Sequence, residues 1–230
     1  MRTLGLIGGM SWESTAIYYE LINRGVKARL GGHHSARLVL HSVDFAEIER
    51  MQRAGAWDEA GEMLAAAALS LERAGAEALV LCTNTMHRVA PAIERAVGAP
   101  LLHIVDPTAR AIRAAGLKRV GLLATRFTME EKFYAGRLEE RHGLEVLVPE
   151  ADDRAFVHRV IYDELVHGRV VEASRAGYLR VIEKLAARGA HGVILGCTEI
   201  GMLVKPESVA LPCLDTTTLH AEAAVDFALG

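Results

Sequence analysis

The 230-residue sequence has few of the features that indicate a metal, a disulfide, a membrane or a nucleic acid. It holds only 3 cysteines, Cys82, Cys197 and Cys213, without CxxC or His-rich spacing, which argues against a disulfide framework and against a zinc site. No stretch reaches the roughly 18 apolar residues of a membrane span, and the N-terminus turns to glycine too soon for a signal peptide. The net charge is only -3 and the basic residues are scattered, so the sequence predicts no basic patch that would bind nucleic acid. We expect a cytoplasmic protein with reduced thiols and a small-molecule partner, binding no nucleic acid and no membrane.

The sequence does contain a regular alternation of short apolar runs and long helical patterns. Runs rich in β-forming residues predict eight strands, at 3–8, 36–42, 78–82, 101–104, 119–125, 144–149, 192–197 and 210–215. Between them lie helical patterns such as 57–75, with Ser11 placed to cap a helix that begins near Trp12. Gly75 and Gly189 follow two such patterns and predict helix ends. This alternation is typical of an α/β fold with parallel sheets.

The two halves of the chain repeat each other. Residues 3–15 resemble 119–131, and residues 74–85 resemble 188–200, at nearly constant offsets. The second alignment puts Thr83 opposite Cys197. We therefore predict an α/β fold of two pseudo-equivalent open parallel-sheet domains that face each other across a cleft. The first domain is expected to comprise 1–105 plus 209–230, and the second 106–208.

The three cysteines differ in their sequence settings. Cys82 ends an apolar run and Cys213 lies within another, so we interpret both as core residues. Cys197, in the motif GCTE, comes just after a predicted strand and before two polar residues. Ligands of open α/β sheets bind beyond the carboxyl ends of the strands. We expect Cys197 to be an exposed thiol near backbone N–H groups that lower its pKa.

Six motifs, taken together over the whole chain, resemble the aspartate/glutamate racemase superfamily of cofactor-independent amino-acid racemases. These motifs are GLIGGMSWEST (5–15), SVDF (42–45), CTNTMH (82–87), HIVDPTA (103–109), TRFTME (125–130) and GCTEIG (196–201). The similarity is greatest to a subgroup that includes an enterobacterial broad-specificity aspartate/glutamate racemase. The resemblance implies a PLP-independent isomerase of the cytoplasm that uses no cofactor and no metal, a small-molecule amino-acid substrate and a homodimer.

The resemblance also implies roles for individual residues. Two residues exchange protons with the substrate α-carbon; Cys197 is retained, and Thr83 stands where most members carry a second cysteine. The implied substrate-binding residues are Met10, Gln52, Asn84, Thr85, Thr125, Thr128 and Thr198. Thr125 and Thr128 could equally be helix caps, and Met10 and Trp12 could be packing residues. Glu199 could either tune the reactivity of Cys197 or lie on a solvated helix face. His87 has the same two alternatives with respect to Thr83, and for His87 we favour the solvated helix face.

The substrate and the reaction retain alternatives. Aspartate-specific relatives carry an arginine and a lysine where this chain has Ile48 and His167. Aspartate and glutamate remain the leading substrate candidates, but because these two cations are missing, a neutral or hydroxylated amino acid stays an alternative. Arg50 and Arg53 could compensate, although surface arginines on a helix are commoner. A related isomerase or decarboxylase is a second class, and an amino-acid-binding module without catalysis is a third.

Overall fold

The computed structural model describes all residues from Met1 to Gly230 and divides them into two compact units. The first unit holds Met1–Ile104 and His220–Gly230, and the second unit holds Val105–Leu219. The chain therefore passes between the units twice. The first passage, after Ile104, lies one residue before the expected boundary, whereas the second, after Leu219, lies 11 residues after the expected one.

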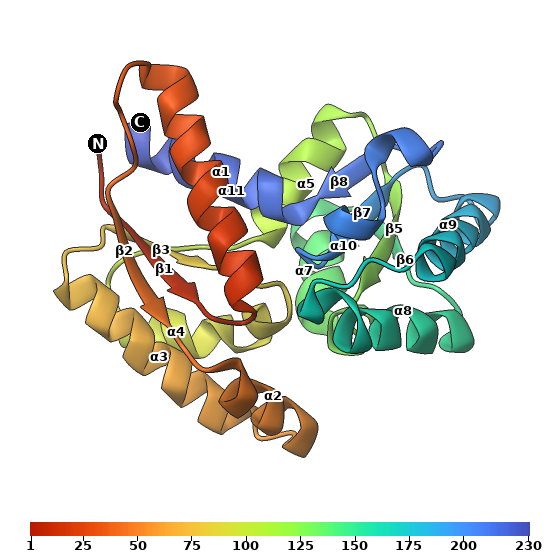
Figure 1. Ribbon diagram of the computed structural model, residues 1–230, viewed down its shortest axis with the longest axis horizontal. Coiled ribbons are helices and arrows are strands. Elements are labelled where there is room, and N and C mark those ends of the chain that lie inside the picture. Colours follow the sequence, from red (N-terminus) through yellow and green to blue (C-terminus); the bar gives the residue numbers. More distant parts are fainter. The chain divides into compact units, whose positions relative to one another are not determined.

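The first unit contains a four-stranded parallel sheet with the strand order β2-β1-β3-β4 (Figure 1). Its strands are β1 (Leu4–Gly8), β2 (Leu38–Ser42), β3 (Ala78–Leu81) and β4 (Leu101–Leu102). Its helices are α1 (Trp12–Leu30), α2 (Phe45–Ala54), α3 (Trp57–Arg73), the 3-10 helix η1 (Thr85–Val89) and α4 (Ala90–Ala96). The C-terminal part of α11 (Thr216–Leu229) also belongs to this unit.

The second unit contains another four-stranded parallel sheet, with the order β6-β5-β7-β8. Its strands are β5 (Arg119–Ala124), β6 (Glu145–Leu147), β7 (Val193–Gly196) and β8 (Cys213–Asp215). Its helices are α5 (Val105–Ala114), α6 (Arg126–Glu130), α7 (Lys132–His142), α8 (Ala151–Asp163), η2 (Leu165–His167), α9 (Glu172–Ala187), α10 (Ile200–Leu203) and η3 (Pro206–Ser208). Strand β8 pairs with β7, and this pairing explains why residues 209–219 lie in the second unit and not in the first.

The strand orders confirm the α/β fold with parallel sheets and the repeat. Adding four to each strand number of the first sheet gives the order of the second. The central pair of each sheet is equivalent, since β1 pairs with β3 as β5 pairs with β7. No helix combines the length and the apolar character that crossing a membrane would require.

Alternation along the strands buries both faces of the first sheet. Ile7 and Leu79 point into one apolar cluster with α3, whereas Leu6 and Val80 point into another with α1 and α11. Successive strand residues face opposite sides of a sheet, so strands that are apolar throughout need cover on both faces. Helices on both sides of the sheet provide that cover (Figure 1).

Local signals in the sequence position the strand ends. Ser11 caps α1, and its side chain accepts a hydrogen bond from the Ser14 N–H. Gly75 and Gly189 each follow a long helix with φ of 92°, a conformation that side chains with a Cβ rarely adopt. The three predictions are confirmed.

Candidate active site

The residues predicted for the first half of the site lie around the carboxyl edge of the first unit's sheet. Met10 follows β1 by two residues and Thr83 follows β3 by two residues. Since β1 and β3 are parallel neighbours, these loops leave the same edge. All five predicted residues of this unit are buried: Met10, Gln52, Thr83, Asn84 and Thr85. Gln52 reaches from α2 and places its Nε2 3.1 Å from the sulfur of Met86.

The first turn of α1 holds the loops after β1 and β3 together. Ser14 Oγ lies 2.9 Å from the carbonyl oxygen of Ser11 and 3.2 Å from that of Cys82. Thr15 Oγ1 accepts a hydrogen bond from the Gly9 N–H at 2.8 Å. Buried hydroxyls with such partners fix backbone that lies outside the sheet ladder. Trp12, by contrast, is 68% exposed, so the alternative that it packs in the core is wrong.

His87 supports the loop that carries Thr83. Its Nδ1 lies 2.8 Å from the Thr83 carbonyl oxygen, and its Nε2 lies 3.2 Å from the Ile104 backbone nitrogen. An N–H only donates, so Nε2 accepts from Ile104, and the proton on Nδ1 is donated to Thr83. His87 is 1% exposed, so its interpretation as a solvated helix-face residue is wrong. The imidazole is neutral and acts on the Thr83 backbone.

Two more buried histidines extend this support. The His87 ring lies 4.6 Å from the ring of His103 and 5.8 Å from the ring of His220, measured between centroids. His220 Nε2 donates to the Leu102 carbonyl oxygen at 2.6 Å, and its Nδ1 lies 2.9 Å from the Tyr18 hydroxyl. The structure holds no group of three or more His, Cys, Asp or Glu side chains placed to bind a metal ion. The hydrogen bonds and ring contacts connect the loop that carries Thr83 with β4 and with α1.

In the second unit, Thr125 and Thr128 form the turn after β5. Thr125 is the N-cap of α6, and its hydroxyl oxygen accepts from the Thr128 N–H at 3.4 Å. The two hydroxyl oxygens lie 3.2 Å apart, and both side chains are buried. The capping interpretation is confirmed for Thr125. A cap of this kind leaves further N–H groups of the short helix α6 at the carboxyl edge of the sheet.

Cys197 follows β7 directly and is in contact with a carboxylate. Its thiol donates to Glu199 Oε2 at 2.9 Å, and the thiol is only partly buried whereas Glu199 is 4% exposed. Burial and the Glu199 carboxylate raise the pKa of the Cys197 thiol well above its ordinary value. The backbone N–H groups of Glu199 and Thr198 lower this pKa, but their effect is smaller. The prediction of a lowered pKa is therefore wrong.

Thr198 is anchored by the start of α11. The Thr217 hydroxyl donates to Thr198 Oγ1 at 3.1 Å, and the Thr216 hydroxyl donates to the Leu195 carbonyl oxygen at 3.0 Å. All three threonines are buried. The loop after β7 is thus held from the side of β8, because α11 begins directly after that strand.

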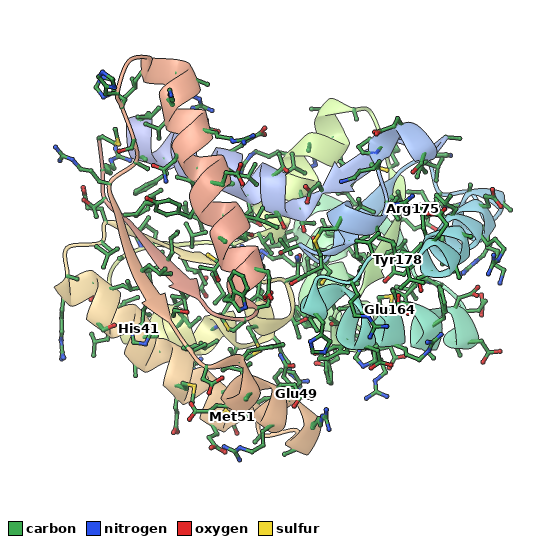
Figure 2. The ribbon with its side chains drawn as sticks, in the orientation of Figure 1. His41, Glu49, Met51, Glu164, Arg175 and Tyr178 are labelled. Atoms are coloured by element: carbon green, nitrogen blue, oxygen red, sulfur yellow. The ribbon has the colours of Figure 1, made fainter.

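The four positions considered for contact with a distal substrate carboxylate lie in dissimilar surroundings. Ile48 is buried in the core of the first unit. Arg53 pairs with Glu49, and Arg50 lies 3.5 Å from Glu59, on the exposed side of α2 (Figure 2 labels Glu49 and Met51 on this helix). His167 is exposed at the end of η2. Both arginines are surface ion pairs, as the commoner interpretation held.

The structure places two further polar residues, His87 and Glu199, beside the strand-end loops. His87 lies four residues after Thr83, and Glu199 lies two residues after Cys197. Their positions within CTNTMH and GCTEIG were the available signal. The burial of these two side chains could not be predicted from the sequence, because polar and charged residues are mostly exposed.

Comparisons with known proteins agree with this fold. The chain matches the sequence profile of the Asp/Glu/hydantoin racemase family over residues 7–224. A proposed Asp/Glu racemase from Yersinia pestis has a crystal structure with a TM-score of 0.94 and 56% identity, and 100% of each chain is covered. The structure of an aspartate racemase homologue from Pyrococcus horikoshii OT3 has a TM-score of 0.85 and 32% identity, again with 100% of each chain covered. RacX of Bacillus subtilis, a broad-specificity amino-acid racemase, is 22% identical over 175 residues, which span 73% of this chain and 72% of RacX.

The fold, the strand-end loops and these matches define an isomerase. More narrowly, the chain belongs to the Asp/Glu/hydantoin racemase family, and within that family it is an amino-acid racemase.

Proposed function

We propose that this protein interconverts L- and D-aspartate or L- and D-glutamate without pyridoxal phosphate or metal, and that Cys197 and Thr83 exchange protons with the substrate α-carbon. The observation that carries this proposal is the equivalence of the two residues. Thr83 follows β3 and Cys197 follows β7, which hold the same place in the strand orders of the two sheets. Racemisation needs one group that removes the α-proton and another that delivers a proton to the opposite face.

The polar side chains around these two residues suit the substrate's α-carboxylate. Asn84 and Thr85 in the first unit, and Thr125, Thr128 and Thr198 in the second, offer amide, hydroxyl and backbone N–H donors, and Met10 and Gln52 are two further buried residues of the first unit. Removing the α-proton moves negative charge onto the carboxylate oxygens. Fixed donors that meet this growing charge lower the barrier to reaction.

The substrate class has one further candidate. Relatives named as aspartate racemase homologues support an acidic substrate. The buried Ile48 and the ion-paired Arg50 and Arg53 provide no free cation for a second carboxylate on α2. A neutral or hydroxylated amino acid is therefore the second candidate, in line with the broad-specificity relative.

Chiral chromatography of the products separates the proposal from its alternatives. Incubation with L-aspartate or L-glutamate should yield the D-enantiomer, whereas a decarboxylase or another isomerase would give a different product and a binding module none. Cys197→Ala and Thr83→Ala should each abolish turnover. Activity should survive exhaustive dialysis against EDTA; loss that added metal restores would contradict a metal-free reaction.

We also propose a cytoplasmic homodimer, which sedimentation and cell fractionation can test.

A further inference from the structure

The carboxylate of Glu199 is directed at Cys197 by a closed turn. The Ile200 N–H donates to the Cys197 carbonyl oxygen at 3.1 Å, which closes a turn of four residues, 197–200. Glu199 occupies the N-cap position of α10, yet its side chain makes no capping hydrogen bond there. Oε2 instead accepts the thiol proton at 2.9 Å. That distance is typical of hydrogen bonds between the smaller nitrogen and oxygen atoms, so the contact is close.

The surroundings of this pair carry negative charge. Burial raises the pKa of the Tyr178 hydroxyl on α9 well above its ordinary value, and the charges of Cys197, Glu164 and Glu199 raise it further (Figure 2 labels Tyr178 and Glu164). The Tyr178 hydroxyl donates to the Val157 carbonyl oxygen at 3.0 Å and so stays protonated. The charge that acts on the thiol is that of the Glu199 carboxylate. A free thiolate beside a buried carboxylate would place two negative charges together, which is costly.

We infer that Glu199 is the proton partner of Cys197, taking the thiol proton before the sulfur removes the α-proton of the substrate. The inference rests on the proposed role of Cys197. In the first step the S–H bond breaks and an O–H bond forms on Glu199. In the second step the Cα–H bond breaks, its electron pair stays on the substrate, and the proton binds sulfur. The pair thus carries one proton when it acts as a base and two when it acts as an acid.

This two-proton cycle makes Glu199 a positioning residue with a specific chemical signature. Glu199 need not touch the substrate, because it acts through the sulfur. It keeps the resting thiol protonated and still allows a thiolate to form without a net increase in buried negative charge. An amide in its place can neither take the proton nor oppose the thiolate.

Alkylation of Cys197 by iodoacetamide measures the state of this thiol independently of racemisation. A Cys213→Ser background removes the other partly buried thiol, Cys82 is fully buried, and peptide mass spectrometry identifies the modified residue. In Glu199→Gln the alkylation rate of Cys197 at pH 7 should rise about tenfold or more, because thiolate reacts and the opposing charge is gone. The same variant should lose roughly 10²-fold in kcat, with KM changed less than about threefold. Its plot of kcat against pH should also lose the inflection that comes from titration of the Cys197–Glu199 pair.

Two variants serve as controls. Glu199→Asp keeps a carboxylate and should recover part of kcat and slow alkylation again. Glu164→Gln removes another carboxylate that acts on Tyr178 and should leave the alkylation rate of Cys197 within about twofold, since Glu164 is not among the groups that shift the pKa of the thiol.

Specific results would overturn the inference. Glu199→Gln that alkylates at the parent rate, or that loses kcat with an unchanged pH profile, would reduce Glu199 to a packing residue. If Cys197→Ala still racemises, the proposed function fails, whereas the alkylation rates still decide whether Glu199 holds the thiol proton. If Glu199→Gln does not fold, infrared spectra of the parent minus Cys197→Ala decide the matter: an S–H band shifted to lower frequency is expected, and a band at the free-thiol position would contradict the pairing.

Discussion

The loop after β3 and the loop after β7 hold equivalent places in two sheets of the same strand order. The residues that contact Thr83 in the first loop and Cys197 in the second are nevertheless different. Thr83 is supported by a neutral imidazole, His87, which binds its carbonyl oxygen. Cys197 is contacted by a carboxylate, Glu199, which binds its thiol. The repeated topology reproduces the position, whereas neighbours two to four residues later set the chemistry. His87 acts on the backbone at Thr83, whereas Glu199 acts on the side chain of Cys197.

This difference predicts that the two loops will not tolerate an exchange of side chains equally. Cys197→Thr should lower kcat by at least about 10³-fold, because a hydroxyl is a far weaker acid than a thiol and Glu199 cannot draw the proton from it. The rate of D-product formation, read by chiral chromatography, measures this loss. Cys213→Thr makes the same substitution in the same unit, in β8, and should keep kcat within about threefold. Equal losses in both variants would mean that the loop after β7 has no special role.

The reverse exchange sharpens the comparison in deuterated water. Reprotonation from the Thr83 side should be slow, so one enantiomer should wash out its α-proton well before it racemises, while the other should show little excess exchange. Thr83→Cys should narrow the difference between the enantiomers, since a thiol is a better proton donor than a hydroxyl. Proton NMR of the α-position alongside chiral analysis measures both rates. Equal washout from both enantiomers of the parent protein would show that Thr83 is not the weaker side.

The sequence predicted the fold because the fold depends on pattern. Apolar runs such as 78–82 alternate with amphipathic helices, and the internal repeat links Thr83 to Cys197 before any coordinates are known. The expected domain boundary at residue 209 differs from the observed one after Leu219 for a physical reason. The sequence does not say to which sheet a short terminal strand will pair, and β8 pairs with β7.

The candidate site was less predictable, because its chemistry depends on burial. Cys197 was expected to have a lowered pKa since backbone N–H groups surround it, and those groups are indeed present. The larger effects are burial and Glu199, whose carboxylate turns inward where a solvated orientation was an equal alternative. His87 was misjudged in the same way, since its buried partner Ile104 lies 17 residues away in the sequence.

The support of the Thr83 loop by His87 can be separated into its two hydrogen bonds. His87→Asn places an amide N–H where Nδ1 lies, so it should keep the bond to Thr83 and lose the one to Ile104. His87→Gln extends to the position of Nε2, so it should do the opposite. We expect each variant to lose about 1–3 kcal/mol of unfolding free energy, because one buried polar group is left without a partner. Only His87→Gln should also lower kcat, by roughly tenfold, because misplacing a reacting group is costly.

Denaturant unfolding and kcat, measured on both His87 variants, test this separation. A Gln variant with the kcat of the parent would show that the Thr83 carbonyl needs no donor. An Asn variant that loses as much kcat as the Gln variant would show that the anchor at Ile104 matters equally.

The smallest effect on catalysis is expected at Cys82, the residue next to Thr83. Its sulfur lies in the apolar cluster of the first sheet with Tyr18 and Val80, and burial raises its pKa far above the ordinary range, so it stays a neutral thiol. Cys82→Ala removes one buried atom and should cost on the order of 1 kcal/mol of unfolding free energy. Its kcat should stay within about threefold of the parent value, in contrast to Thr83→Ala, one position further on. If Cys82→Ala were folded and inactive, the thiol next to Thr83 would be the proton-handling group of this loop, and the equivalence of Thr83 with Cys197 would be wrong.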